Sequence, residues 1–122
     1  MIVTLFSFGF KHAPPEADTV FDVRFLPNPY YVPELSPETG LDRDVAGYVL
    51  DNKAADIFFH SFEPFIIAFL QCHADTNRES FRIGVGCTGG RHRSVAVAEK
   101  IRKVLENHGV MVNLFHRDIE KV

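Results

Sequence analysis

Runs of apolar residues along the chain predict four β-strands. Residues 2–8 are apolar nearly throughout, as expected for a strand that is covered on both faces of a sheet. Residues 20–25 alternate apolar with charged positions, which places Asp22 and Arg24 on one face of a second strand. Residues 81–86 and 110–115 are the third and fourth predicted strands.

Helical spacing of apolar residues predicts three helices between these strands. Residues 39–50 form the first, and an aromatic stripe marks the second, with members at Phe58, Phe62, Phe65, Ile66 and Phe69. The second helix begins either after Ser61, with Pro64 in its first turn, or near Asp56, with a kink at Pro64. The third carries its stripe at Val97, Ile101, Val104 and Leu105, and Gly109 caps its end.

The order of these elements predicts an α/β fold. A strand, a glycine-rich turn, a helix and another strand within about 35 residues make a βαβ unit, which requires parallel strands. Six of the seven prolines lie between Pro14 and Pro37, so this part of the chain is predicted to be largely loop. We predict a single domain, residues 1–122, with a mostly parallel sheet of about four strands flanked by helices.

Composition and charge narrow the functional classes. The chain is 46% hydrophobic, enough for a core, and its net charge of −3 disfavours general nucleic-acid binding. Two cysteines are too few for a disulfide framework and favour a reducing, cytoplasmic location. The N-terminus lacks the pattern of a signal peptide, and the apolar stretch of residues 57–70 is shorter than a bilayer, so no membrane span is predicted.

The segment GCTGGRHRS, residues 86–94, predicts a phosphate-binding loop between a strand and a helix. Glycines let backbone amides converge on one point, and the helix N-terminus adds free donors and partial positive charge. The segment matches neither a Walker A motif nor a dinucleotide fingerprint, and no cofactor is predicted. The predicted anion-binding residues of this loop are Cys87, Thr88, Gly89, Gly90, Arg91, His92, Arg93 and Ser94.

A catalytic alternative rests on the spacing of Cys87 and Arg93. Followed by Ser94, they form Cys-x5-Arg-Ser, the pattern of cysteine-dependent phosphatases, in which a thiolate attacks phosphorus. The general acid would be Asp22, Asp42 or Asp44. The other interpretation of Cys87 is a small buried residue that closes the loop.

Residues outside the loop complete the predicted site. Asp22 and Arg24 precede the proline-rich loop and are expected at the same sheet edge as Cys87. Lys11 and His12 follow the first strand, so they are also expected at this sheet edge, although they indicate a site less specifically. The histidines at 60, 73 and 108 lack metal-ligand spacing, and no metal site is predicted.

Several sequence blocks resemble the C-terminal domain of the RNase adapter protein RapZ family. The two most specific are FDVRFLPNP at residues 21–29 and GCTGG followed by HRSV within residues 86–95; the others are FGFK at 8–11, TGLD at 39–42 and HRD at 116–118. Together they span almost the whole chain.

The resemblance implies a non-catalytic sensor domain related to a phosphofructokinase subdomain. It implies binding of glucosamine-6-phosphate, assembly into homo-oligomers, and a contribution to small-RNA binding that directs RNA cleavage. Carried over onto this chain, the pocket consists of Asp22, Arg24, Asn28, Thr88, Gly89, Gly90, His92, Arg93 and Ser94.

Three departures from the family pattern modify these expectations. The sequence has no counterpart of the family's N-terminal P-loop domain, so ATP binding is not expected of it. Tyr30 stands where enterobacterial members often have histidine, which bears on sugar specificity. The family's basic tail is replaced by Glu120-Lys121-Val122, which weakens the RNA role more than the phosphosugar role.

Overall fold

Four strands form one parallel sheet in the computed structural model, which describes residues 1–122. The strands are β1 (Ile2–Gly9), β2 (Thr19–Asp22), β3 (Ser80–Cys87) and β4 (Met111–His116), arranged in the order β2-β3-β1-β4. Every pair of neighbours is parallel, so the predicted α/β class is confirmed and the sheet is parallel throughout. β2 is shorter than predicted because the chain leaves the sheet after Asp22.

Three α-helices and one short 3₁₀ helix accompany the sheet. They are η1 (Pro29–Tyr31), α1 (Arg43–Leu50), α2 (Lys53–Ala74) and α3 (Arg93–Asn107). Both predicted starts of α2 are too late, because Asn52 caps the helix by accepting a hydrogen bond from the Ala55 amide at 3.0 Å. Pro64 therefore lies inside α2, on its exposed side, where water can bond the carbonyl that loses its partner.

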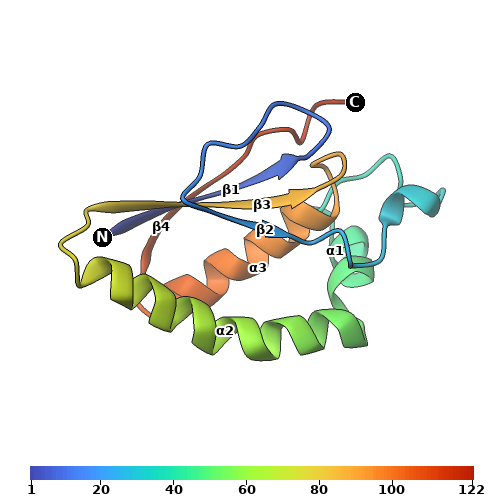
Figure 1. Cartoon of the computed structure of the whole chain (residues 1–122). Coiled ribbons are helices and arrows are strands. Elements are labelled where there is room, and N and C mark those ends of the chain that lie inside the picture. The colour runs from blue at the N-terminus through green and yellow to red at the C-terminus, as the bar shows by residue number, and fades with distance from the viewer.

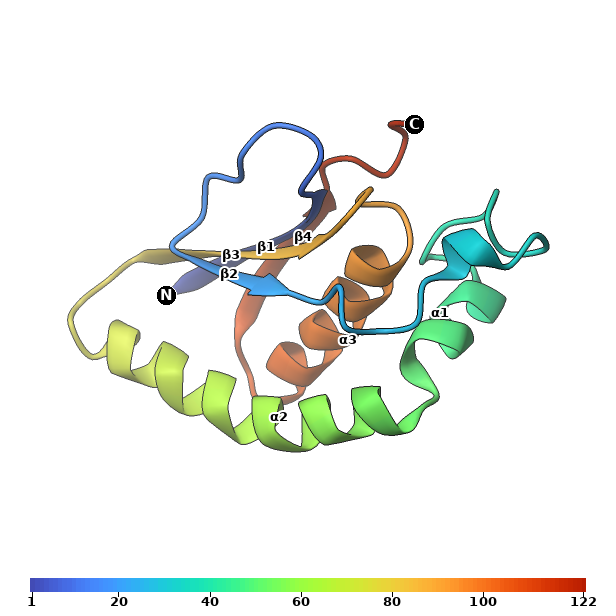
Figure 2. The same cartoon turned by 45° about the vertical axis from the view of Figure 1, so that its right-hand side comes forward.

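The crossover connections between strands all have the same handedness. Two of them, β2 to β3 and β3 to β4, advance in the same direction across the sheet and place the helices on one face (Figure 1). The connection from β1 to β2, residues 10–18, runs the other way and crosses the opposite face (Figure 2). Parallel crossovers of uniform hand require this arrangement.

The core lies between the sheet and the helices. β1 and β3 are its centre, with nearly every residue buried, and α3 packs directly against the sheet. α2 contributes one face, formed by Ala55, Phe59, Phe62, Ile66 and Leu70. By length and composition alone α2 is long and apolar enough to cross a membrane, as the core helix of a soluble protein can also be.

The close approach of Gly40 to α3 depends on the absence of a side chain. The Gly40 amide donates to the Arg91 carbonyl at 2.8 Å. A Cβ at this position would lie 2.6 Å from the Ala96 nitrogen and would also collide with the His92 carbonyl oxygen. Backbone atoms of a helix cannot move aside as a flexible side chain can.

We predict that Gly40→Ala lowers the free energy of unfolding by about 2–3 kcal/mol, since it overpacks a backbone contact. Urea denaturation measures the difference. Gly47→Ala is the matched control, because its Cβ would meet only the Asp51 carboxylate at 3.3 Å. In a helix that change is expected to stabilise by up to about 1 kcal/mol. Equal effects at both glycines would contradict the prediction.

Candidate functional site

The carboxyl ends of β1 and β3 lie side by side, with Gly9 opposite Cys87. The chain leaves these two ends toward opposite faces of the sheet, β1 into residues 10–18 and β3 into α3. Such a reversal is the usual position of ligand sites in open α/β sheets. The predicted phosphate loop, residues 87–94, lies at this position.

Two glycines allow the β1 end and the loop to touch. A Cβ on Gly9 would lie 2.5 Å from the Gly89 carbonyl carbon, and one on Gly90 would lie 2.5 Å from the Gly9 nitrogen. Gly90 also has a φ of +80°, which disfavours other residues. The ladder continues past the strand ends, because the Phe10 amide donates to Cys87 and the Lys11 amide to Thr88.

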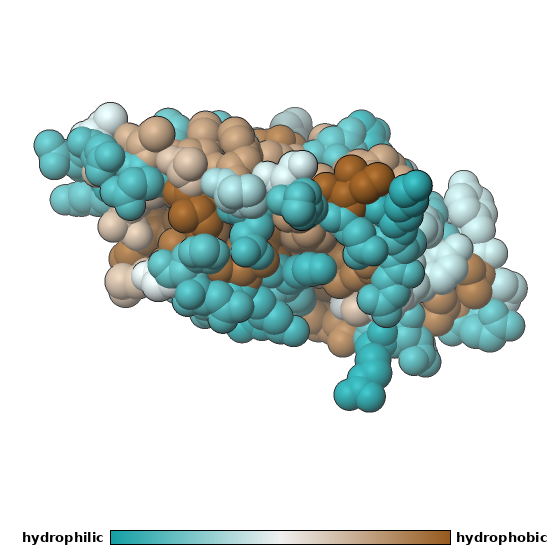
Figure 3. Space-filling model, turned by 90° about the horizontal axis from the view of Figure 1, so that it is seen from below, coloured by the Kyte–Doolittle hydropathy of each residue, from teal (hydrophilic) through white to brown (hydrophobic).

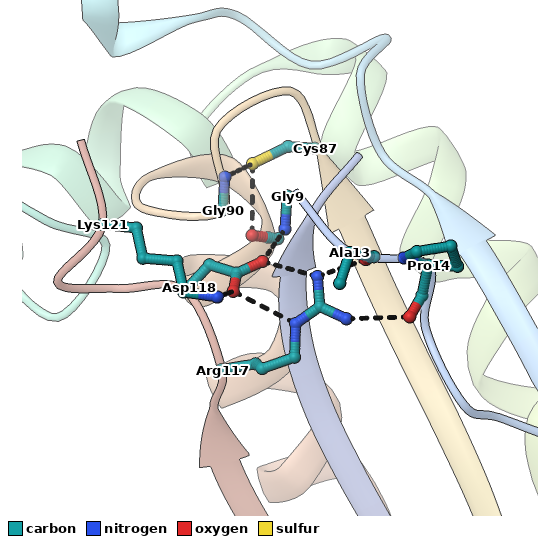
Figure 4. A network of polar contacts seen from close by, with 9 residues as sticks. Gly9, Ala13, Pro14, Cys87, Gly90, Arg117, Asp118 and Lys121 are labelled. Atoms are coloured by element: carbon teal, nitrogen blue, oxygen red, sulfur yellow. Dashed lines mark hydrogen bonds and ion pairs between the residues drawn. The ribbon is translucent and has the colours of Figure 1, made fainter. Parts of the chain in front are cut away.

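A buried carboxylate holds this junction together (Figure 4). Asp118 is fully buried and accepts from the Gly9 amide at 2.8 Å, from Arg117 Nη2 at 2.8 Å and from Lys121 Nζ at 2.7 Å. Burial raises its pKa, but the hydrogen bonds from Arg117, Gly9 and Lys121 outweigh that effect and hold the pKa well below its usual range. Asp118 is therefore ionised.

Arg117 extends the same network to the β1–β2 connection. Its guanidinium donates to the carbonyls of Ala13 at 2.6 Å and Pro14 at 3.2 Å (Figure 4). The C-terminal residues thus fix both segments that follow β1 and β3. The sequence block HRD marked these residues, but nothing in the sequence alone pointed to their partners.

We predict that Asp118→Asn lowers the free energy of unfolding at pH 7 by about 2–3 kcal/mol, because an amide cannot pair with both cations. The folded-state pKa is depressed, so the contribution of the carboxylate is complete above the unfolded-state pKa of about 3.9 and is lost as pH falls below it. The gap between wild type and variant should therefore narrow in acid, as measured by urea denaturation.

The exposed carboxylate of Glu120 supplies the control. Glu120→Gln is expected to change stability by less than about 0.5 kcal/mol at either pH. A constant gap between wild type and Asp118→Asn from pH 7 to pH 3 would show that the charge of Asp118 contributes nothing.

Cys87 closes the loop from inside. It is 3% exposed, and its sulfur accepts the Gly90 amide at 3.3 Å and donates to Ser94 Oγ at 3.1 Å. Ser94 itself is fully buried. A nucleophile must reach its substrate, so this geometry favours the structural interpretation of Cys87 over the catalytic one.

The N-terminus of α3 has no protein group to neutralise it. His92 precedes the helix without a side-chain cap, and the first turn contains no acidic residue. No protein acceptor bonds the amides of seven residues here, namely Thr88, Gly89, Arg91, His92, Arg93, Ser94 and Val95. Free amides at a helix N-terminus attract an anion.

Arg93 brings a buried positive charge to the same place. It is 6% exposed, and its guanidinium donates to the carbonyls of Arg24 at 2.8 Å and Leu26 at 3.4 Å and to Thr88 Oγ1 at 3.4 Å. No carboxylate pairs with it. A guanidinium has five N–H donors, so three bonds leave two donors free.

Asp22 and Arg24 lie at the end of β2, where Arg93 anchors the backbone. Arg24 Nη2 lies 2.7 Å from Asp22 Oδ2, and the guanidinium stacks 4.2 Å from the centre of the Phe10 ring. Hydrogen bonding from Arg24 lowers the pKa of Asp22. Both side chains are about half exposed, so the pair is open to a ligand and adds little stability.

Three of the predicted ligand residues use their side chains to build the loop. His92 Nε2 lies 3.0 Å from the Ser36 carbonyl, and burial lowers its pKa. Arg91 Nε donates to the Ile119 carbonyl at 3.0 Å. Asn28 Oδ1 accepts the Tyr30 amide at 3.1 Å and caps η1. Thr88 and Gly89 remain accessible at the tip.

Lys11 is a functional candidate that the anion-loop pattern left out. Its Cε lies 3.9 Å from where a Gly89 Cβ would be, and its side chain is exposed and has no ion-pair partner. Positive groups therefore outnumber carboxylates around the loop: Lys11, Arg24, Arg91, Arg93, Arg117 and Lys121 against Asp22 and Asp118. The edge is basic although the chain is acidic overall.

The site is a shallow surface. Five hollows on the molecule have other linings, and none of them includes Thr88, Gly89 or Arg93. We give the loop precedence over these hollows because residues 87–94 gather free amides and the unpaired Arg93 and contain no carboxylate. A ligand here would be bound through its anionic end, and the rest of it would lie on the surface.

A partly buried hydrogen-bonded array near the loop is structural. Ser7 Oγ lies 2.6 Å from His116 Nδ1, and His116 Nε2 lies 2.8 Å from Glu99 Oε2. The order of groups resembles a hydrolase triad, but Ser7 is fully buried in the centre of the sheet. The array joins β1, β4 and α3.

Fold and site together define a parallel α/β domain with an open, basic loop at the point where the strand connections diverge. Residues 1–120 match the family model described as the RapZ C-terminal domain. The chain belongs to this family, as the sequence resemblance indicated.

Curated relatives carry the name nucleotide-binding protein. One in Caldicellulosiruptor bescii is 47% identical over 122 residues, covering 99% of this chain and 42% of that protein. One in Thermotoga neapolitana is 47% identical over 98% of this chain and 43% of its own length, and one in Corynebacterium glutamicum is 47% identical over 98% and 39%. The chain thus spans about two fifths of the length of these relatives.

Proposed function

We propose that this domain is a non-catalytic sensor that binds a phosphorylated small molecule of the glucosamine-6-phosphate type on residues 88–93 and acts as a regulatory domain in the cytoplasm. The observation that carries the proposal is the uncapped N-terminus of α3 beside the unpaired Arg93. A phosphate would supply the acceptors that these donors lack.

The surroundings of the loop suit the remainder of such a ligand. Lys11 lies on one side of Gly89, and the Asp22–Arg24 pair lies at the end of the neighbouring strand. Asp22 is ionised and half exposed, so it can accept hydrogen bonds from hydroxyl or ammonium groups. The site therefore pairs an anion-binding end with an acceptor.

The relatives support a phosphorylated ligand in general terms, because they are named nucleotide-binding proteins. Their names refer to proteins more than twice as long as this chain. For that reason we propose phosphate binding by the loop for this domain, and we do not propose binding of a nucleoside triphosphate.

The two other candidate functions have less support. A cysteine phosphatase needs an accessible thiolate, whereas the Cys87 sulfur is buried and hydrogen-bonded. RNA binding, which directs cleavage in an adapter, needs a broad basic surface, whereas this chain is acidic overall and only six of its 13 Lys and Arg residues gather around the loop.

We predict that glucosamine-6-phosphate binds with measurable heat in calorimetry and that glucosamine, which lacks the phosphate, does not. Gly89→Val should weaken the binding by at least about tenfold, because a branched side chain would cover the loop amides. The fold should tolerate it, since a Cβ at Gly89 meets only Lys11 Cε at 3.9 Å. The melting temperature of the variant tests that point.

Gly47→Ala, a glycine substitution away from the loop, is the control and should leave affinity unchanged. Turnover of an aryl phosphate by wild type that is lost in Cys87→Ser would instead support the phosphatase alternative. The proposal fails if no phosphorylated ligand binds, or if Gly89→Val binds as tightly as wild type while remaining folded.

A further inference from the structure

The two faces of the sheet are covered differently. The helices cover one face, and their outer surface mixes polar with apolar groups (Figure 3). The other face carries no helix and is crossed by the β1–β2 connection (Figure 2). On this open face an arginine packs over each of three successive phenylalanine rings. The pairs, with the distance from the guanidinium carbon to the ring centre, are Phe6–Arg82 at 5.2 Å, Phe8–Arg117 at 5.4 Å and Phe10–Arg24 at 4.2 Å.

The Phe10–Arg24 pair lies at the proposed anion site. The Phe10 amide donates to the Cys87 carbonyl at 2.8 Å, so this residue lies beside the strand end that leads into the loop. Its ring lies against Gly86, because a Cβ there would come within 2.5 Å of a ring carbon. Phe8 packs edge-on against the same ring, with the two centres 4.9 Å apart. These contacts fix the Phe10 ring next to the beginning of the loop.

The guanidinium of Arg24 is held by two groups and still has free donors. Its Nε lies 3.0 Å from Asp22 Oδ1 and its Nη2 lies 2.7 Å from Asp22 Oδ2, while the Phe10 ring supports the guanidinium carbon. No protein group accepts a hydrogen bond from Nη1, so its two hydrogens and one on Nη2 remain available. The Arg24 side chain is 48% exposed, so a ligand can reach these donors.

The other two pairs have a structural role on the open face. Arg82 Nε donates to the Glu16 carbonyl at 2.8 Å, and Arg117 donates to two further carbonyls of the β1–β2 connection. Both arginines therefore attach this connection to the sheet. Arg24 makes no such backbone contact with its guanidinium, so the support from Phe10 serves a group that faces solvent.

We propose that Phe10 is a positioning residue of the phosphosugar site, whose ring holds the Arg24 guanidinium where its free donors can meet the ligand. This role rests on the proposed function, because it requires a ligand at the loop. A long side chain that is ordered only on binding reduces affinity, whereas one that is already held does not. A cation–π contact at an exposed site corresponds to a change of about two- to fivefold in affinity.

Calorimetry with glucosamine-6-phosphate on a double-mutant cycle tests the proposal. Phe10→Leu keeps the apolar bulk but removes the aromatic face, so it should weaken binding about two- to fivefold. In an Arg24→Gln background the same change should leave affinity as it is in Arg24→Gln alone, because the ring acts through the guanidinium. Phe6→Leu is the matched control: it disrupts the Arg82 pair on the same strand and should lower stability but not affinity.

A measurement without ligand tests the positioning directly. Nitrogen-15 relaxation should show an ordered Arg24 Nε–H in wild type and in Phe6→Leu, and a more mobile one in Phe10→Leu. The melting temperature checks that each variant is folded, and Phe10→Met repeats the test with a second side chain that lacks a ring.

Three results would overturn the proposed role of Phe10. An Arg24 Nε–H that is equally ordered in wild type and Phe10→Leu would do so whatever the ligand does. Binding by wild type with additive losses in the cycle would overturn this role and leave the proposed function intact. No binding of a phosphorylated ligand by wild type would overturn both.

Discussion

The contact between the ends of β1 and β3 is the constraint on which the rest of this structure depends. Gly9 and Gly90 meet without room for a side chain, and Asp118 binds the Gly9 amide from the end of the chain. An ionised carboxylate can remain buried here because an amide, a guanidinium and an ammonium all donate to it. This contact fixes the position of the loop that follows β3.

That position determines the chemistry available to the loop. Because Cys87 and Ser94 satisfy each other in the interior, neither presents a reactive group to solvent. The groups left without protein partners are donors only, from the amides of α3 and from Arg93. Donors of this kind bind an anion.

The sequence predicted the parts that depend on local pattern. The apolar runs located β1, β3 and β4, and the glycine-rich segment located the loop, because strand burial and tight turns leave local signatures. Interactions between distant positions were not predictable: Asp118 and Gly9 lie 109 residues apart, and β2 ends early where Arg93 binds the Arg24 carbonyl, 69 residues away. The alternatives for Cys87 share one spacing, and only its burial separates them.

The same reasoning explains why predicted ligand residues divide into two kinds. The side chains of His92, Arg91 and Asn28 each form a hydrogen bond with a backbone group, so they shape the loop and the segment facing it. Thr88, Gly89, Lys11 and the Asp22–Arg24 pair stay accessible. A family motif contains residues of both kinds, since a substitution in either kind would disturb the site. Differences in ligand preference among relatives should therefore arise at the accessible residues. Substitutions of His92, Arg91 or Asn28 should instead affect whether the loop forms at all.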